Sequence, residues 1–103
     1  MQSFNLIQNE ANGQRVLFSS GRIVITPAAQ ETLATAGVAI ETLLDRHFTG
    51  DGGDLCSDDA YANTVAIESG LRVFSSYAVG AGRIWILTEA GRSSTTIMEP
   101  DDY

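Results

Sequence analysis

A small set of side chains in this sequence could carry acid-base and phosphate chemistry. A general acid or base, an arginine facing an anionic oxygen and nearby hydroxyl groups are the parts of a metal-independent phosphodiesterase or transferase. His47 is the only histidine, so it is the one side chain with an ordinary pKa near neutrality. The candidates for a catalytic group are His47, Tyr77, Glu89, Arg92 and Thr95.

Each of these side chains also has a purely structural interpretation. His47 lies on the apolar stripe of a predicted helix, which favours a place in or beside the core. Two adjacent strands would bring one group of polar side chains together, although hydroxyl groups on strands also pair as ordinary sheet surface. The group consists of Tyr77, Thr88, Glu89, Ser93, Thr95 and Thr96, with Arg92 at the turn. Because ribonuclease toxins of the RelE and barnase type carry such residues on an antiparallel sheet, a ribonuclease is kept as the alternative hypothesis.

A second set of candidate residues consists of carboxylates. The acidic loop near residue 51 does not have the spacing of a calcium-binding loop, in which alternate positions and a distal glutamate converge, so no metal site is predicted. Carboxylates at the start of the following helix are also favoured by its dipole. As contact charges for a protein partner we select Asp51, Asp54, Asp58, Asp59, Glu99, Asp101 and Asp102.

The charge of the whole chain limits its partners. Thirteen acidic residues against six basic ones give a net charge of -7, and the six basic residues, all arginines, are spread along the sequence. A nucleic-acid binder needs a clustered basic surface, so direct nucleic-acid binding is not expected. An acidic domain is instead attracted to basic protein surfaces. We therefore predict a protein partner with a basic surface, and no cofactor.

Length, cysteine content and hydrophobic runs indicate a single cytoplasmic domain. A chain of 103 residues with 44% hydrophobic residues can bury one core. Cys56 is the only cysteine, which excludes an internal disulfide and suits a reducing cytosol. We expect no signal peptide, because the N-terminus lacks a basic n-region and a continuous apolar h-region. We also expect no membrane span, because no run approaches the roughly 20 apolar residues that crossing a bilayer requires. The oligomeric state is not predicted.

The first strands are predicted from turn signals and β-branched residues. Asn12-Gly13 favours a hairpin turn between strands near residues 4–7 and 15–18. The β-branched run Arg22-Ile23-Val24-Ile25 predicts a further strand. Residues 1–14 are interpreted as an N-terminal extension, and residues 15–70 as the strands and helices of the domain.

Three helices are predicted next. Thr26 as the N-cap and Pro27 begin the first, which Gly37 ends. The second spans residues 39–48, and its apolar stripe contains Ile40, Leu43, Leu44, His47 and Phe48. Ser57 is expected to cap the third, which ends at Gly70. One face of that helix groups Tyr61, Thr64, Val65 and Glu68.

Residues 71–98 change to a period of two, which predicts an antiparallel β-meander with turns near Gly80 and Gly91. Residues 99–103 are expected to form a polar, acidic tail. The predicted fold class is α+β: three short helices followed by the meander, with N-terminal strands that join or flank the same sheet.

Several segments together resemble a family of small proteins labelled plasmid-related proteins, which occur on plasmids, prophages and other mobile elements. The similar segments cover roughly residues 18–103. They are Gly21–Pro27, Arg46–Asp51 with Gly53-Asp54, Ser76-Tyr77, Ile84–Ala90, Thr95–Ile97 and the Pro100–Tyr103 end. Family members usually carry tryptophan in place of Gly52 and an acidic residue in place of Gly91.

The resemblance implies a mobile-element accessory protein. Small acidic accessory proteins include inhibitors of host defence, such as anti-restriction and anti-CRISPR proteins, some of which present carboxylates to nucleic-acid channels. Our hypothesis from the sequence is therefore a domain without enzymatic activity that binds a basic host protein through its acidic surface.

Overall fold

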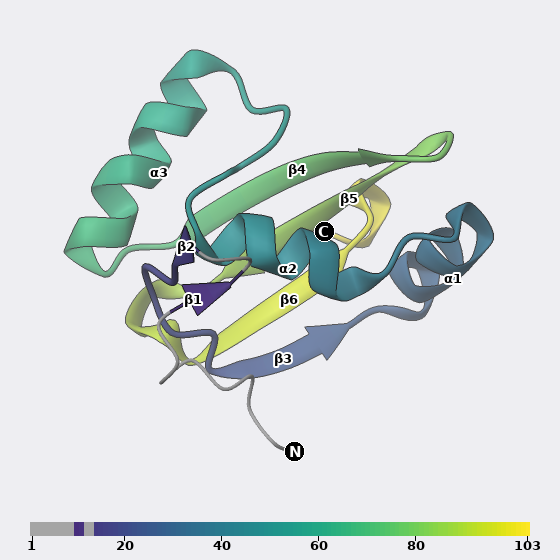
Figure 1. Cartoon of the computed structure of the whole chain (residues 1–103), viewed down its shortest axis with the longest axis horizontal. Helices are drawn as coiled ribbons and strands as arrows, with labels where there is room; N and C mark the ends of the chain where they lie inside the picture. Colours follow the sequence, from purple (N-terminus) through teal and green to yellow (C-terminus); the bar gives the residue numbers. More distant parts are fainter. Residues whose placement is uncertain (1–9, 12–13) are drawn as a thin grey trace.

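A computed structural model describes residues 10–11 and 14–103 of the chain. Its main unit is a four-stranded sheet with strand order β3-β6-β5-β4 and three helices packed on one face (Figure 1). In chain order the elements are β1 (Glu10–Ala11), β2 (Gln14–Arg15), β3 (Arg22–Ile25), α1 (Pro27–Ala36), α2 (Ile40–Phe48), α3 (Ser57–Ser69), β4 (Val73–Val79), β5 (Gly82–Thr88), the 3-10 turn η2 (Ala90–Arg92), β6 (Ser94–Met98) and the 3-10 turn η3 (Pro100–Asp102).

The predicted α+β class is confirmed. Strands β4, β5 and β6 form the antiparallel meander. Strand β3 joins the same sheet at its other end by pairing in parallel with β6, and the three helices connect β3 to β4 at the opposite edge. The pairing of β3 with β6 places Ile23 beside Thr95 and Ile25 beside Ile97 on the core side. Strands β1 and β2 form a separate antiparallel pair.

The predictions for the N-terminal strands are only partly met. The predicted strand near residues 4–7 and the Asn12-Gly13 turn lie outside the described residues. The predicted strand at 15–18 is wrong beyond Arg15, because residues 16–18 have no strand conformation. Instead the Leu17 N–H donates to the Phe48 carbonyl at 2.8 Å, at the end of α2. Val16 and Phe18 are buried, so their spacing reflects packing on that helix end rather than sheet pairing.

Helices α1 and α2 begin and end close to the predicted positions. The Thr26 hydroxyl accepts the Ala29 N–H at 3.2 Å, and Gly37 ends α1 with a left-handed φ of 69°. Both helices lie over the strands (Figure 1), and their apolar side chains belong to the core. The principal core side chains are Leu33, Leu43, Leu44, Phe48, Val73, Tyr77, Val79, Ile84, Ile86 and Ile97.

The face of α3 that groups Tyr61, Thr64, Val65 and Glu68 is its exposed face. Tyr61 is 70% exposed, whereas Ala66 is buried and Ile67 packs against the core. Asn63 decides the orientation, because its side chain bonds the N–H and the carbonyl of Phe74 on the outer edge of β4. The predicted cap is also shifted: Ser57 is the first helical residue, and Cys56 occupies the N-cap without a side-chain hydrogen bond.

The sheet face opposite the helices is partly covered by the C-terminal turn. Trp85 alternates with the core residues of β5 and therefore points away from the helices. Its ring contacts Phe74 at a centroid distance of 5.0 Å and Tyr103 at 6.0 Å. In the part of the chain that the structure describes, none of the helices has the length and apolar character needed to cross a membrane.

Candidate functional site

Helix α2 and the sheet enclose a chain of buried polar side chains around His47. His47 Nδ1 lies 2.6 Å from Ser75 Oγ, and Nε2 lies 2.9 Å from Thr88 Oγ1. Thr88 Oγ1 is 2.8 Å from Thr95 Oγ1, whose hydroxyl donates to the Ser20 carbonyl at 2.8 Å. The four residues whose side chains form this polar network, His47, Ser75, Thr88 and Thr95, are each at most 1% exposed. The interpretation of His47 as a core histidine is confirmed.

The last acceptor in this chain determines the direction of the other hydrogen bonds. Because Thr95 donates its only hydroxyl proton to the Ser20 carbonyl, its oxygen accepts the proton of Thr88. Thr88 in turn accepts from His47 Nε2–H, which leaves Nδ1 to accept the Ser75 hydroxyl proton. These partners therefore assign a neutral imidazole with its proton on Nε2.

Burial keeps His47 uncharged. Desolvation, with a smaller contribution from the positive charge of Arg92, lowers the pKa of His47 to about 3. A general base works best when its pKa is near the working pH and it reaches the substrate proton. His47 is enclosed, both ring nitrogens are occupied, and it is neutral at pH 7. Its contacts are those of a structural hydrogen-bonding group.

Arg92 is engaged with the end of α3. Its guanidinium donates to the Leu71 carbonyl at 2.6 Å and to the Ala66 carbonyl at 2.9 Å. The same group lies 5.1 Å from the Phe18 ring centre, and Phe18 contacts the His47 ring edge-on at 5.3 Å. Phe18 therefore contacts both groups. Arg92 thus donates to carbonyl oxygens in and just after the last turn of α3. Because α3 has no basic side chain of its own in that turn, Arg92 supplies the positive charge there.

Replacing Arg92 with alanine is expected to lower the free energy of unfolding by about 1 to 2 kcal/mol, because carbonyl groups at the end of α3 lose their charged donor. Amide hydrogen exchange should speed up most in the last turn of α3. The control is Arg72→Ala, which removes an exposed 3.4 Å ion pair with Glu89 and should cost less than about 0.5 kcal/mol. Equal losses in the two variants would contradict the role given to Arg92.

Tyr77 and Glu89 lie in different environments. Tyr77 is 1% exposed and donates its hydroxyl proton to the Asp51 carbonyl at 2.5 Å. Burial is the main reason why the pKa of Tyr77 rises to about 12. Glu89 follows β5 at the surface and pairs with Arg72. Tyr77 pairs with Ile84 near the turn between β4 and β5, whereas Glu89 follows the opposite end of β5. The expectation that Tyr77 and Glu89 share one cluster is therefore wrong.

The acidic loop after α2 is held in place by arginines. Asp51 accepts from Arg46 Nε at 2.7 Å and from Arg46 Nη2 at 3.3 Å. The hydrogen bond from Arg46 is the main reason why the pKa of Asp51 is lowered. Asp54 pairs with Arg83 of β5 at 3.2 Å. Asp58 and Asp59 are exposed in the first turn of α3.

The C-terminal residues, predicted as a polar, acidic tail, contain an ordered turn. Asp102 accepts the Thr26 hydroxyl proton at 2.7 Å and the Glu99 N–H at 3.0 Å. The hydrogen bond from Thr26 is the main cause of the lowered pKa of Asp102. The Thr32 hydroxyl donates to Glu99. Asp101 is exposed on this turn. The turn is therefore attached to the start and the middle of α1.

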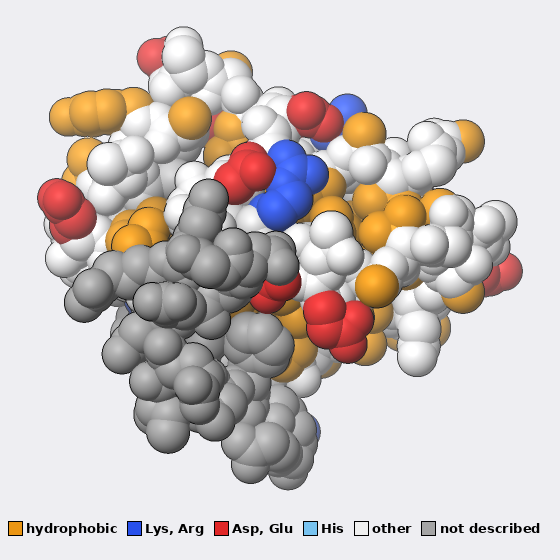
Figure 2. All heavy atoms as spheres, in the orientation of Figure 1, with side chains coloured by type: hydrophobic (Ala, Val, Ile, Leu, Met, Phe, Trp, Pro, Cys, Tyr) orange, Lys and Arg blue, Asp and Glu red, His pale blue; other side chains and the backbone are white. Residues whose placement is uncertain are grey.

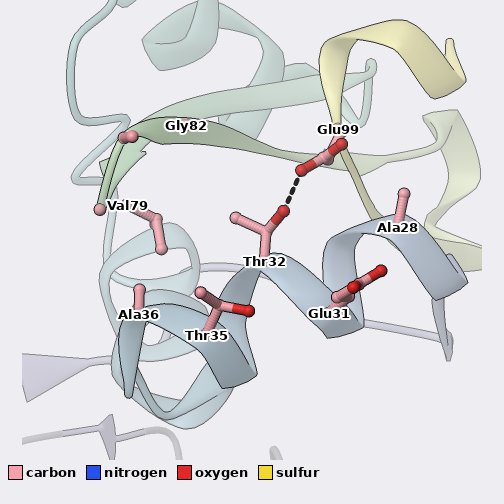
Figure 3. A pocket seen from close by; sticks show the side chains of 10 residues that line it. Ala28, Glu31, Thr32, Thr35, Ala36, Val79, Gly82 and Glu99 are labelled. Carbon is pink, nitrogen blue, oxygen red and sulfur yellow. Dashed lines mark hydrogen bonds between the residues drawn. The ribbon is translucent and has the colours of Figure 1, made fainter.

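A cleft that the sequence did not reveal lies beside this attachment. It has a volume of about 540 Å³ and separates α1 from the turn between β4 and β5 (Figure 3). Its lining residues are Ala28, Glu31, Thr32, Thr35, Ala36, Val79, Gly80, Ala81, Gly82 and Glu99. The spacing of Glu31, Thr32 and Thr35 on α1 was the only local signal, because the opposite wall is far away in sequence.

Neither a family model, nor a curated protein, nor a solved structure matches this chain in the comparisons with known proteins. The likeness to plasmid-related proteins therefore stays a prediction. Over residues 10–11 and 14–103, no three His, Cys, Asp or Glu side chains gather closely enough to hold a metal ion. Three features make up the candidate site: a buried polar chain, an acidic helical surface and a cleft.

Proposed function

We propose that this domain binds a basic partner protein through the surface formed by its helices. The observation that carries the proposal is the uneven distribution of charge. Residues 27–70, which form α1, α2, α3 and their loops, contain only one arginine, Arg46. The same segment contains the carboxylates Glu31, Glu41, Asp45, Asp51, Asp54, Asp58, Asp59 and Glu68. Figure 2 shows red carboxylates spread over this side, with few blue groups among them.

Most of these carboxylates are available to a partner. Within the described structure, arginine pairs involve only Asp51 and Asp54 of this segment. Glu31, Glu41, Asp58 and Asp59 are exposed, so they are free to attract a basic surface over the distance of a Debye length. The helical surface thus extends the acidic patch predicted from the loop to all three helices.

The partner class that fits this pattern best is a protein that itself binds nucleic acid. Such a protein carries a basic channel or groove, and an acidic domain can occupy that surface in place of the phosphate backbone. Together with the resemblance to plasmid-related proteins, this supports a mobile-element accessory protein that inhibits a host defence nuclease of the CRISPR or restriction type. The ribonuclease alternative has less support, because its candidate residues are buried, ion-paired or engaged with a helix end. It stays a prediction.

The test is phage plating on bacteria that carry a nuclease-based defence system. Expression of the domain should restore plating, and the combined variant Glu41→Gln, Asp58→Asn, Asp59→Asn should lose this effect. Binding of the purified nuclease should weaken about tenfold in that variant and fall further with added salt.

Glu89→Gln is the control, since it removes a carboxylate from the far end of the meander and should leave both readouts unchanged. Plating restored equally well by the combined variant would contradict the proposal. So would growth arrest with RNA cleavage on expression of the domain alone, which would instead favour the ribonuclease.

A further inference from the structure

The cleft beside the C-terminal turn combines a small apolar interior with carboxylates at its rim. Ala28 and Ala36 contribute methyl groups from α1, and Val79 and Ala81 contribute the opposite wall. Figure 3 shows Thr32 reaching across toward Glu99, while Glu31 and Thr35 lie on the same helix. The cleft volume of about 540 Å³ lies within the range of sites that bind small ligands.

We propose that this cleft receives an arginine side chain of the basic partner. The inference rests on the proposed function and adds the chemistry by which that partner is held. The aliphatic stem of an arginine can lie on apolar surface while its charged end reaches polar groups. The walls formed by Ala36 and Val79 suit such a stem, and among the residues that the structure describes no arginine lines the cleft.

The polar groups of the cleft match a guanidinium in particular. A guanidinium has five N–H donors in a rigid plane and no acceptor, so it needs several acceptors at different angles. Glu31 and Glu99 supply carboxylate oxygens from two elements. Thr32 gives its proton to Glu99, so its oxygen remains an acceptor, and Thr35 is exposed beside it. Lysine is a point charge with three donors and fits this set less well.

A second hollow continues from the cleft. It has a volume of about 360 Å³ and shares Ala81, Gly82 and Glu99 with the first. Pro100 and Asp101 of the C-terminal turn and Arg83 of β5 line the rest of it. Glu99 therefore stands between the two hollows, and residues next to the bound arginine in a partner chain would pass over a surface where the charge of Asp101 is offset by Arg83.

Gly82 offers a way to fill the cleft without changing any charge. Its φ lies outside the left-handed region, and a Cβ there would stand 3.6 Å from Thr32 Cγ2, which is an ordinary van der Waals distance. Alanine is therefore tolerated, and a leucine would extend over the cleft from β5. Gly80 does not offer this option, because its φ of 57° strains any side chain.

The experiment is an NMR titration with N-acetyl-arginine methylamide as the probe. Shifts should concentrate at Thr32, Thr35 and Gly82, and the lysine analogue should bind more weakly. Glu31→Gln should weaken binding about threefold to tenfold, and Gly82→Leu should abolish it. Gly82→Ala serves where the leucine variant does not fold, and should weaken binding measurably. Glu68→Gln, which makes the same charge change at the far end of α3, should bind the probe like the wild type.

Two results would overturn the cleft proposal. One is unchanged binding in the Gly82 variants, and the other is an equal loss in Glu31→Gln and Glu68→Gln, which would indicate only general attraction to an acidic surface. The two proposals fail separately. If the domain inhibits its nuclease while the cleft variants have no effect, the cleft is wrong and the function stands. If the probe binds in the cleft but the domain binds no nuclease, the proposed function is wrong and the arginine-binding cleft stands.

Discussion

His47→Ala is expected to lower the free energy of unfolding by about 3 to 5 kcal/mol. The substitution removes a ring that is 1% exposed, which leaves a cavity under α2. It also leaves the Ser75 hydroxyl without its acceptor and Thr88 without its donor in a place that water does not reach. Both effects act in the same direction, so the loss exceeds that of removing an ordinary surface group.

Urea unfolding followed by circular dichroism measures this loss directly. Thr95→Val is the companion variant: it keeps the side-chain volume, removes one link of the polar chain, and should cost about 1 to 3 kcal/mol. A loss below about 1 kcal/mol for His47→Ala would show that the polar chain contributes little. A normal stability with a lost biological effect would indicate instead that His47 acts on a ligand.

The fold was predictable to the extent that local patterns specify it. The alternation after Leu71, the cap at Thr26-Pro27 and the apolar stripe of α2 depend on neighbours a few residues away, and all three are confirmed. The parallel pairing of β3 with β6 was not predicted, because a β-branched run indicates a strand but does not name its partner.

The site was less predictable, because its contacts span long stretches of sequence. The hydrogen bond from Thr26 to Asp102 joins residues 76 positions apart, so no local pattern in the acidic tail predicts its attachment to α1. Arg92 had the residue type of a phosphate ligand, yet its partners are helix carbonyls that no sequence pattern marks. The cleft likewise depends on α1 meeting the turn between β4 and β5.

Lowering the pH from about 7.5 to 4.5 is expected to destabilise the domain by about 2 to 3 kcal/mol through His47 alone. Burial lowers the pKa of His47 to about 3 in the folded state, against an ordinary value of 6.5 in the unfolded chain. Between these values the unfolded state binds a proton that the folded state does not. Stability is therefore complete above the unfolded pKa and falls as the pH decreases through this window.

This window separates the histidine from the carboxylates. The lowered pKa values of Asp51 and Asp102 also produce acid destabilisation, but mainly below the ordinary carboxylate pKa of about 3.9. Because His47 is the only histidine, His47→Gln should flatten the pH dependence above about pH 4.5 even if the variant is less stable throughout. Urea midpoints measured at several pH values give the slope. An unchanged slope in His47→Gln would mean that the ring is not held neutral by burial.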